Sequence, residues 1–169
     1  MVVPEIPGGR SDDALDIGAI PLEVFPFHEP SAGERAPAIV AKGPDGRPRA
    51  LAALRGKFVL LHFWSGRPED AATIPHLKAT YDAFGRDPRF TMIGLNSDET
   101  PGPLRRYATL RGLGWEQCYI GSTYDPNPTE AAFGVWFPPA AFLIDPDGRI
   151  LAKDLQDGAI KQAVTRALE

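Results

Sequence analysis

The chain has 169 residues, a hydrophobic fraction of 43% and a formal net charge of −4, which fits one globular domain with a sizeable core. This weakly acidic balance argues against a nucleic-acid-binding protein, which needs a basic patch or stripe. No apolar run approaches the roughly 18 residues of a membrane-spanning helix, and the first residues, 1–5, lack the basic start and long apolar stretch of a signal peptide. We expect no membrane insertion by this chain.

Cysteine usage restricts the chemistry further. The chain has one cysteine, Cys118, so neither an intramolecular disulfide nor a dithiol cycle within one chain is possible. Metal sites built on several thiolates are excluded for the same reason. The three histidines are well separated in the sequence. We therefore expect no metal site and no cofactor.

The N-terminal fifth of the chain differs from the rest. Residues 1–33 are rich in proline and glycine and contain an apolar island at 20–27. Prolines at five positions argue against a helix or a central strand there. We predict an irregular N-terminal arm or linker, and a folded domain over residues 34–169. The island could dock on this domain or on a second copy of it.

From residue 38 onward, regular patterns predict secondary structure. Residues 58–64 form an unbroken apolar run, typical of a strand buried on both faces. Apolar residues then recur at helical spacing up to Phe84, with Pro75 inside the helix. The expected order of elements is a hairpin around the turn 43–46, the strand 58–64, a helix to residue 84, a strand at 90–96, a helix at 103–111, a short strand at 116–120, a helical turn at 130–133, strands at 140–144 and 150–153, and a helix over 160–168. This order predicts an α/β layer sandwich.

Three segments carry a resemblance to a known family. They are a Gly-Lys strand ending in Phe-Trp (54–64), an Ile-Pro-His-Leu segment (74–77) and a Pro-x-x-Phe-Leu-Ile-Asp hairpin (137–149). In this order they resemble the thioredoxin-like redoxins, closest to the TlpA/ResA thiol–disulfide oxidoreductases and allied to the AhpC/TSA proteins. The resemblance covers about residues 34–168. It implies a thioredoxin-like three-layer α/β/α sandwich, with a central mixed sheet of about five strands and an N-terminal hairpin.

The resemblance also implies a binding groove. Pro139 would be the cis-proline that faces the active-site loop and shapes a groove for an extended peptide or protein segment. The alternative is that Pro139 only begins a strand, where proline is tolerated. Family members suggest an extracytoplasmic setting, in the bacterial periplasm or at the cell envelope.

The sequence departs from the family at the catalytic loop. Where the family carries Trp-Cys-x-x-Cys, residues 63–70 contain no cysteine. Counting back from Pro75 places Arg67 and Asp70 at the two cysteine positions, although thiol–disulfide exchange needs a low-pKa thiolate and a resolving thiol. Two interpretations remain. Glu69 and Asp70 stabilise the helix start while Arg67 is solvated, or the loop presents fixed charges to a partner peptide.

The remaining candidates are one thiol and two aromatic residues. Cys118 is either an inert core residue or a reactive thiol. Trp64 and Trp136 either line the groove beside Arg67, Glu69 and Pro139 or belong to the core. We therefore hypothesise a redoxin-like domain that is inactive as a dithiol oxidoreductase and binds a protein or peptide. The alternative is a thiol–disulfide oxidoreductase or peroxidase that uses Cys118 or a partner's thiol.

Overall fold

A single mixed sheet organises the protein. The two central strands, β3 (Phe58–Trp64) and β4 (Phe90–Asn96), are parallel over their full length. β5 (Glu116–Tyr119) continues the parallel part beside β4, and β6 (Ala140–Ile144) runs antiparallel to β3. The structure, a computed structural model, describes residues 29–68, 70–122 and 127–169.

Short strands complete both sides of this sheet. β1 (Ala41–Lys42) and β2 (Pro48–Arg49) form the N-terminal hairpin beside β5, and β7 (Ile150–Ala152) pairs with β6. The strand order is β2-β1-β5-β4-β3-β6-β7. The predicted sheet of about five strands with an added hairpin is therefore confirmed.

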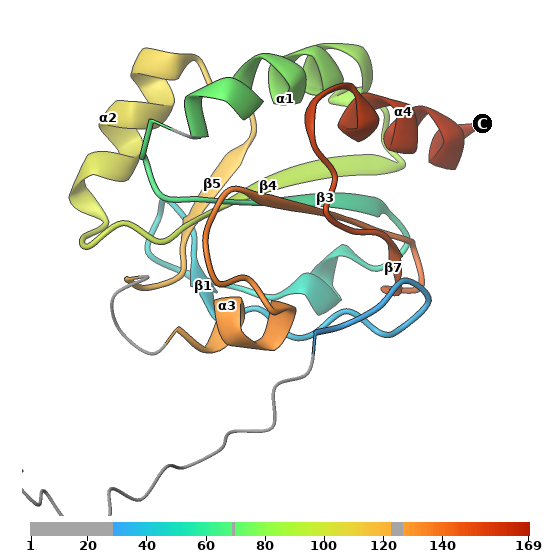
Figure 1. Cartoon of the computed structure of the whole chain (residues 1–169), viewed down its shortest axis with the longest axis horizontal. Coiled ribbons are helices and arrows are strands. Elements are labelled where there is room, and N and C mark those ends of the chain that lie inside the picture. Colours follow the sequence, from blue (N-terminus) through green and yellow to red (C-terminus); the bar gives the residue numbers. More distant parts are fainter. Residues whose placement is uncertain (1–28, 69, 123–126) are drawn as a thin grey trace, which may run out of the picture.

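Helices cover both faces of the sheet (Figure 1). The helices α1 (Asp70–Phe84), α2 (Gly102–Arg111) and α4 (Asp157–Leu168) lie on one face. The helix α3 (Pro128–Phe133) and the 3₁₀ helix η1 (Leu51–Leu54) lie on the other. The three-layer thioredoxin-like α/β/α sandwich is thus confirmed.

The alternation of side chains along β3 produces two cores. Leu60 packs with Leu77 of α1 and Val164 of α4 on one face, and Leu61 packs with Phe133 of α3 on the other. Burial on both faces explains why this strand reads as a continuous apolar run.

The hairpin strands are shorter than the sequence predicts. The backbone N–H of Val40 donates to Thr129 Oγ1 at 2.9 Å rather than to a neighbouring strand. The apolar run 38–41 predicts a strand that begins at residue 38, whereas β1 begins at Ala41. Tertiary contact with α3 overrides the local strand pattern here.

The chain enters the fold along β7. Gly33 N donates to Ile150 O at 2.7 Å, and Ala36 N donates to Gly148 O at 2.9 Å. Glu29 forms an ion pair with Lys153 just beyond β7. Residues 1–28 of the predicted arm 1–33, which include its apolar island, lie outside the described residues, so the boundary at residue 33 stays a prediction. No helix in the described part of the chain has the length and apolar character needed to cross a membrane.

Candidate functional site

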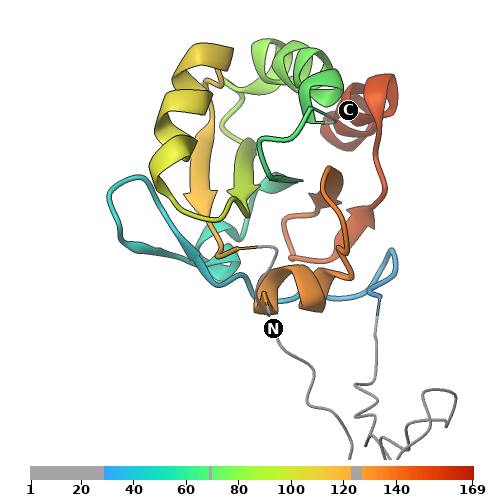
Figure 2. The same cartoon turned by 60° about the vertical axis from the view of Figure 1, so that its left-hand side comes forward.

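Two of the predicted site residues, Trp64 and Pro139, lie at the carboxyl end of the parallel strands. Trp64 at the end of β3 lies opposite Asn96 of β4. On the other side of β3, Phe63 lies opposite Ala140 of β6. Because β6 is antiparallel to β3, Pro139 lies level with Trp64, where the loop to α1 begins. Figure 2 shows the segment leaving β3 (green) next to the segment leading into β6 (orange). In α/β sheets, this edge commonly carries the binding site.

Asp70 anchors the loop that connects β3 to α1. It is the first residue of α1 and is 1% exposed. Its Oδ2 accepts hydrogen bonds from the backbone N–H groups of Ser65 at 3.1 Å and Arg67 at 2.9 Å. Bonds from backbone N–H groups to a carboxylate are among the stronger protein hydrogen bonds. Of the two interpretations of this loop, the one in which Asp70 has a structural role at the helix start is favoured, because the carboxylate is turned into the loop's own backbone.

The loop also lies close to the turn after β4. Gly66 has φ +65°, and a Cβ at this position would lie 3.2 Å from Asp98 Oδ1. Burial raises the pKa of Asp98, while its hydrogen bond from Asn96 and the nearby Arg67 guanidinium oppose that rise. The half-buried Arg67 therefore lies close enough to Asp98 to affect its charge. Glu69 lies outside the described residues.

Trp64 is a buried residue that packs between the sheet and α2, and it does not line a groove. Its side chain is 1% exposed, and Nε1 donates to Gln117 Oε1 at 3.0 Å. Its ring centroid lies 4.9 Å from that of Tyr107 on α2, and the Arg111 guanidinium lies over the Tyr107 ring, 5.3 Å from its centroid. Burial raises the pKa of Tyr107. Of the two alternatives for Trp64, its burial favours the core, because its position on β3 directs it into the packed layer below α2.

The segment before β6 presents two aromatic side chains. The Pro138–Pro139 peptide bond is cis, as expected from the resemblance. Immediately before it, Trp136 is 70% and Phe137 is 79% exposed. Phe137 is not among the site residues that the sequence predicts, although it begins the hairpin segment 137–149. Its direction depends on the turn after α3, which no periodicity reveals.

This aromatic turn follows a segment that is anchored by a helix cap and a buried side chain. Asn127 Oδ1 caps α3 by accepting hydrogen bonds from Thr129 N and Glu130 N, each at 3.1 Å. After Gly134 ends the helix in the left-handed conformation, Val135 is buried. The exposed aromatic pair therefore follows a well-anchored segment.

Cys118 is not part of this site. It lies on β5 and is fully buried in the core cluster that contains Phe63 and Phe133. Burial raises the pKa of its thiol to about 12, Glu116 adds to that rise, and Arg49 opposes it. A thiol with such a pKa supplies very little thiolate near neutral pH. Within the described residues, no group of three or more His, Cys, Asp and Glu side chains is arranged to hold a metal ion.

The sequence is similar to known thiol–disulfide oxidoreductases. No protein-family model matches it. The thiol-disulfide oxidoreductase ResA of Bacillus thuringiensis (strain Al Hakam) is 28% identical over 127 residues, which are 70% of this chain and 66% of that protein. ResA of Bacillus cereus is 27% identical over 128 residues, 72% of this chain and 68% of that protein. The chain thus spans just under two thirds of the first of these relatives.

Solved structures resemble the fold closely. The thioredoxin domain of a thiol-disulfide oxidoreductase from Bacteroides vulgatus has a TM-score of 0.74 and 26% identity, covering 82% of this chain and 99% of that one. A thiol:disulfide interchange protein from Bacteroides sp. has a TM-score of 0.72 and 26% identity, covering 81% and 90%. Fold and relatives together define the class, a thioredoxin-like redoxin. Within this class, its sequence and fold resemble the TlpA/ResA-type thiol–disulfide oxidoreductases.

Proposed function

We propose that this redoxin domain binds an extended segment of a partner protein and does not perform dithiol chemistry. The binding surface consists of Arg67, Trp136, Phe137 and Pro139, and is called the cis-proline surface below. The observation that carries the proposal is the pair of exposed aromatic side chains directly before the cis bond. Tyrosine, tryptophan and arginine are the residues that most often dominate binding energy at interfaces, and this surface contains two of these three types.

The chemistry of the loop supports the same proposal. Thiol exchange needs a thiolate that can reach the substrate disulfide and a second thiol that resolves the mixed disulfide. The loop has neither, and Asp70 is engaged by the backbone of Ser65 and Arg67. The chain's single thiol is buried in the core. The family's scaffold therefore remains, while the groups for its reaction do not.

Peptide selection would test this proposal. Octapeptides selected on the intact protein from a random library would be measured by fluorescence anisotropy. We expect Trp136→Ala/Phe137→Ala to weaken the selected peptides by about 30-fold or more, the range of interface hot spots. Leu110→Ala is the matched control, since Leu110 is 74% exposed on α2 and outside this surface. Selection of no peptide, or equal binding by the double variant, would overturn the proposal.

The relatives' names favour one alternative function. The relatives are thiol-disulfide oxidoreductases, so the chain could reduce disulfides or peroxides through Cys118 or through a thiol from a partner. Disulfide and peroxide reduction would be measured with a dithiol donor for the intact protein and for Cys118→Ser. We expect no turnover by either. Turnover that is lost in the variant would establish a one-cysteine enzyme and reject the binding-only function.

We further propose an extracytoplasmic location, in the bacterial periplasm or at the cell envelope, on the strength of the family resemblance. Fractionation of source cells, followed with an antibody against this domain, would test the location. Detection in the envelope or periplasmic fraction is expected. A signal confined to the cytosolic fraction would contradict the proposal.

A further inference from the structure

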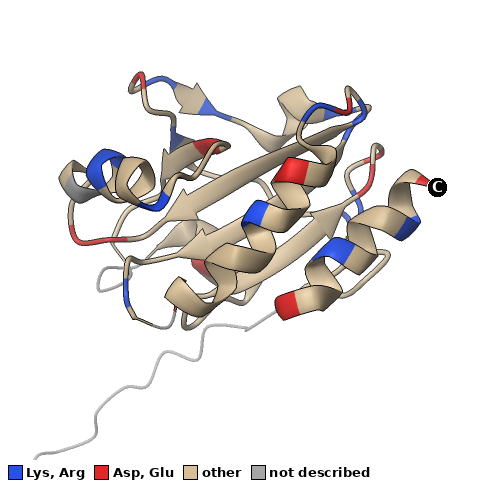
Figure 3. Cartoon of the chain, turned by 90° about the horizontal axis from the view of Figure 1, so that it is seen from above, with Lys and Arg blue, Asp and Glu red and all other residues tan. Residues whose placement is uncertain are grey.

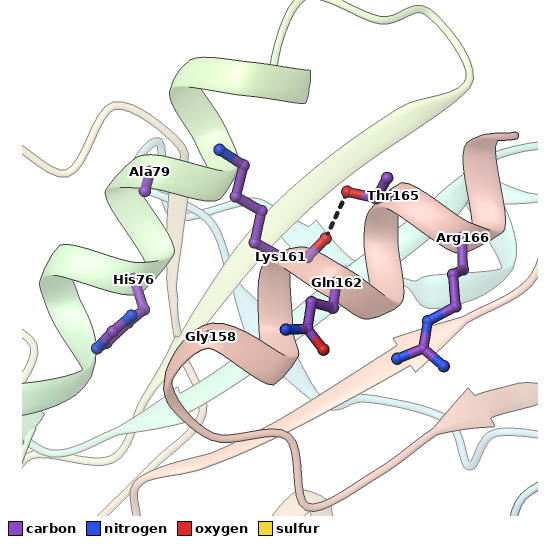
Figure 4. Close-up of a pocket in the computed structure, with 7 residues that line it drawn as sticks. All are labelled: His76, Ala79, Gly158, Lys161, Gln162, Thr165 and Arg166. Carbon is purple, nitrogen blue, oxygen red and sulfur yellow. Dashed lines mark hydrogen bonds between the residues drawn. The ribbon is translucent and has the colours of Figure 1, made fainter.

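A second surface lies between α1 and α4, on the side of these helices that faces away from the sheet. α1 and α4 pack side by side and leave a groove of about 650 Å³ between them. This is within the roughly 300–1,000 Å³ of typical ligand sites. We call it the α1–α4 groove (Figure 4), and its polar lining residues are His76, Lys161, Gln162, Thr165 and Arg166.

The lining of the groove contains two cationic side chains, although the protein as a whole is acidic. Its lining includes Lys161 and Arg166 but no carboxylate, although the whole chain has a formal net charge of −4. Within the described residues, neither of these cations forms an ion pair. Figure 3 shows blue bands along α4 with a red band at its beginning. That beginning carries Asp157, whose Oδ1 lies 3.5 Å from His76 Nε2, outside the groove's lining.

The helix α4, which forms one wall of the groove, is anchored in the core. Ile160, Val164 and Leu168 anchor the opposite face of α4 in the core that contains Leu77 of α1. In Figure 4, Lys161 and Arg166 extend in opposite directions from α4, and Gln162 lies between them. The hydroxyl of Thr165 donates to Lys161 O at 2.9 Å, so the Gln162 amide is the neutral side chain best placed to donate to a ligand.

We propose that the α1–α4 groove binds an acidic peptide segment. One carboxylate would pair with Lys161 and another with Arg166, while the Gln162 amide donates to the segment between them. The positive charges of Lys161 and Arg166 favour an anionic partner. Individual exposed ion pairs are weak, so binding depends on several contacts and falls as salt screens them. This surface is independent of the cis-proline surface, and either can fail without the other.

A pair of charged model peptides would test the proposal on the intact protein. Hexaglutamate is titrated into the ¹⁵N-labelled chain while backbone amide shifts are followed, and hexalysine serves as the opposite-charge probe. We expect hexaglutamate alone to shift Ala79, Gly158 and Gln162 in a saturable manner. We also expect affinity to fall at least fivefold between about 50 and 200 mM salt, because the contacts are exposed.

Neutralising variants separate this groove from general charge attraction. Lys161→Gln/Arg166→Gln is expected to weaken hexaglutamate binding at least tenfold. The matched control, Lys57→Gln/Arg106→Gln, removes the same two charges from exposed positions outside the groove and is expected to change affinity less than threefold. An equal loss in both variants, or shifts outside the groove, would overturn the proposal. Concentration-dependent shifts in the groove without peptide would identify a second copy as the occupant and also overturn it.

Discussion

Two loops lie at the carboxyl end of β3, and they differ in which side chains they bury and which they expose. The loop over residues 65–70 turns polar groups inward, since Ser65 and Asp70 are both buried. The segment over residues 134–139 turns its largest apolar groups outward, at Trp136 and Phe137. In a redoxin, the first loop performs the chemistry and the second helps to hold the substrate. Here Asp70 closes the first loop by accepting hydrogen bonds from the loop's own backbone, and the proposed binding surface therefore rests mainly on the second loop.

The strongest test of this contrast is removal of the inward carboxylate. Asp70→Ala leaves the Ser65 and Arg67 N–H groups without their acceptor, and we expect it to lower the free energy of unfolding by about 3 kcal/mol. Urea unfolding measures the change. Asp70→Asn, which keeps one acceptor oxygen, should cost about half as much. A loss below about 0.5 kcal/mol for Asp70→Ala would show that the loop does not depend on these bonds.

Removal of the exposed aromatic pair should affect binding and leave stability almost unchanged. Trp136→Ala/Phe137→Ala is expected to change the free energy of unfolding by less than about 0.5 kcal/mol, because exposed side chains contribute little to folding. The same variant should lose about 2 kcal/mol of binding energy toward a selected peptide. Parallel urea unfolding and anisotropy measurements give both numbers. A large loss of stability would mean that these rings pack in the fold and are not held for a partner.

The buried thiol offers a test of whether any redox group remains outside the two loops. The pKa of Cys118 rises from its ordinary 9.0 to about 12 in the fold, so the unfolded chain loses the thiol proton first. Stability should therefore fall as the pH rises from 9 toward 12, by at most about 1.4 kcal/mol per pH unit. Comparing urea unfolding of the intact protein and Cys118→Ala at pH 8, 9 and 10 isolates this effect.

Two outcomes would contradict this account of Cys118. One is an unchanged stability difference between the intact protein and the variant from pH 8 to 10. The other is rapid reaction of the folded protein with a thiol reagent at pH 8, since a buried thiol with a raised pKa reacts slowly.

The smallest expected effect concerns the backbone of the inward loop. Gly66→Ala places a side chain at φ +65°, close to the Asp98 carboxylate, and should cost about 1 kcal/mol. Thermal unfolding measures the loss. Gly46→Ala is the matched control, because Gly46 also has a positive φ but no atom within 4 Å of an added Cβ. If both variants lose the same stability, the Asp98 contact contributes nothing beyond backbone strain.

The sequence predicts the scaffold much better than the site. β3, α1 and the cis-proline follow from an apolar run, a helical period and a family segment, all of which are local in the chain. The role of Asp70 does not follow, because its partners are backbone N–H groups that no side-chain pattern reveals. The sequence offers the same two alternatives, groove or core, for Trp64 and for Trp136. Only the alternation of β3 and the turn after α3 bury one and leave the other exposed.

The segment just after the undescribed N-terminal residues has a consequence for self-association. Gly33 and Ala36 donate backbone hydrogen bonds to Ile150 and Gly148, and Ile150 donates back to Glu34. These bonds occupy the outer side of β7, which would otherwise present unpaired backbone groups to any extended chain. Uncovered sheet edges recruit strands from other molecules and start aggregation. A chain truncated before Ala38 would therefore keep the cis-proline surface and the α1–α4 groove. It would also expose the outer edge of β7, where strands of other molecules could pair.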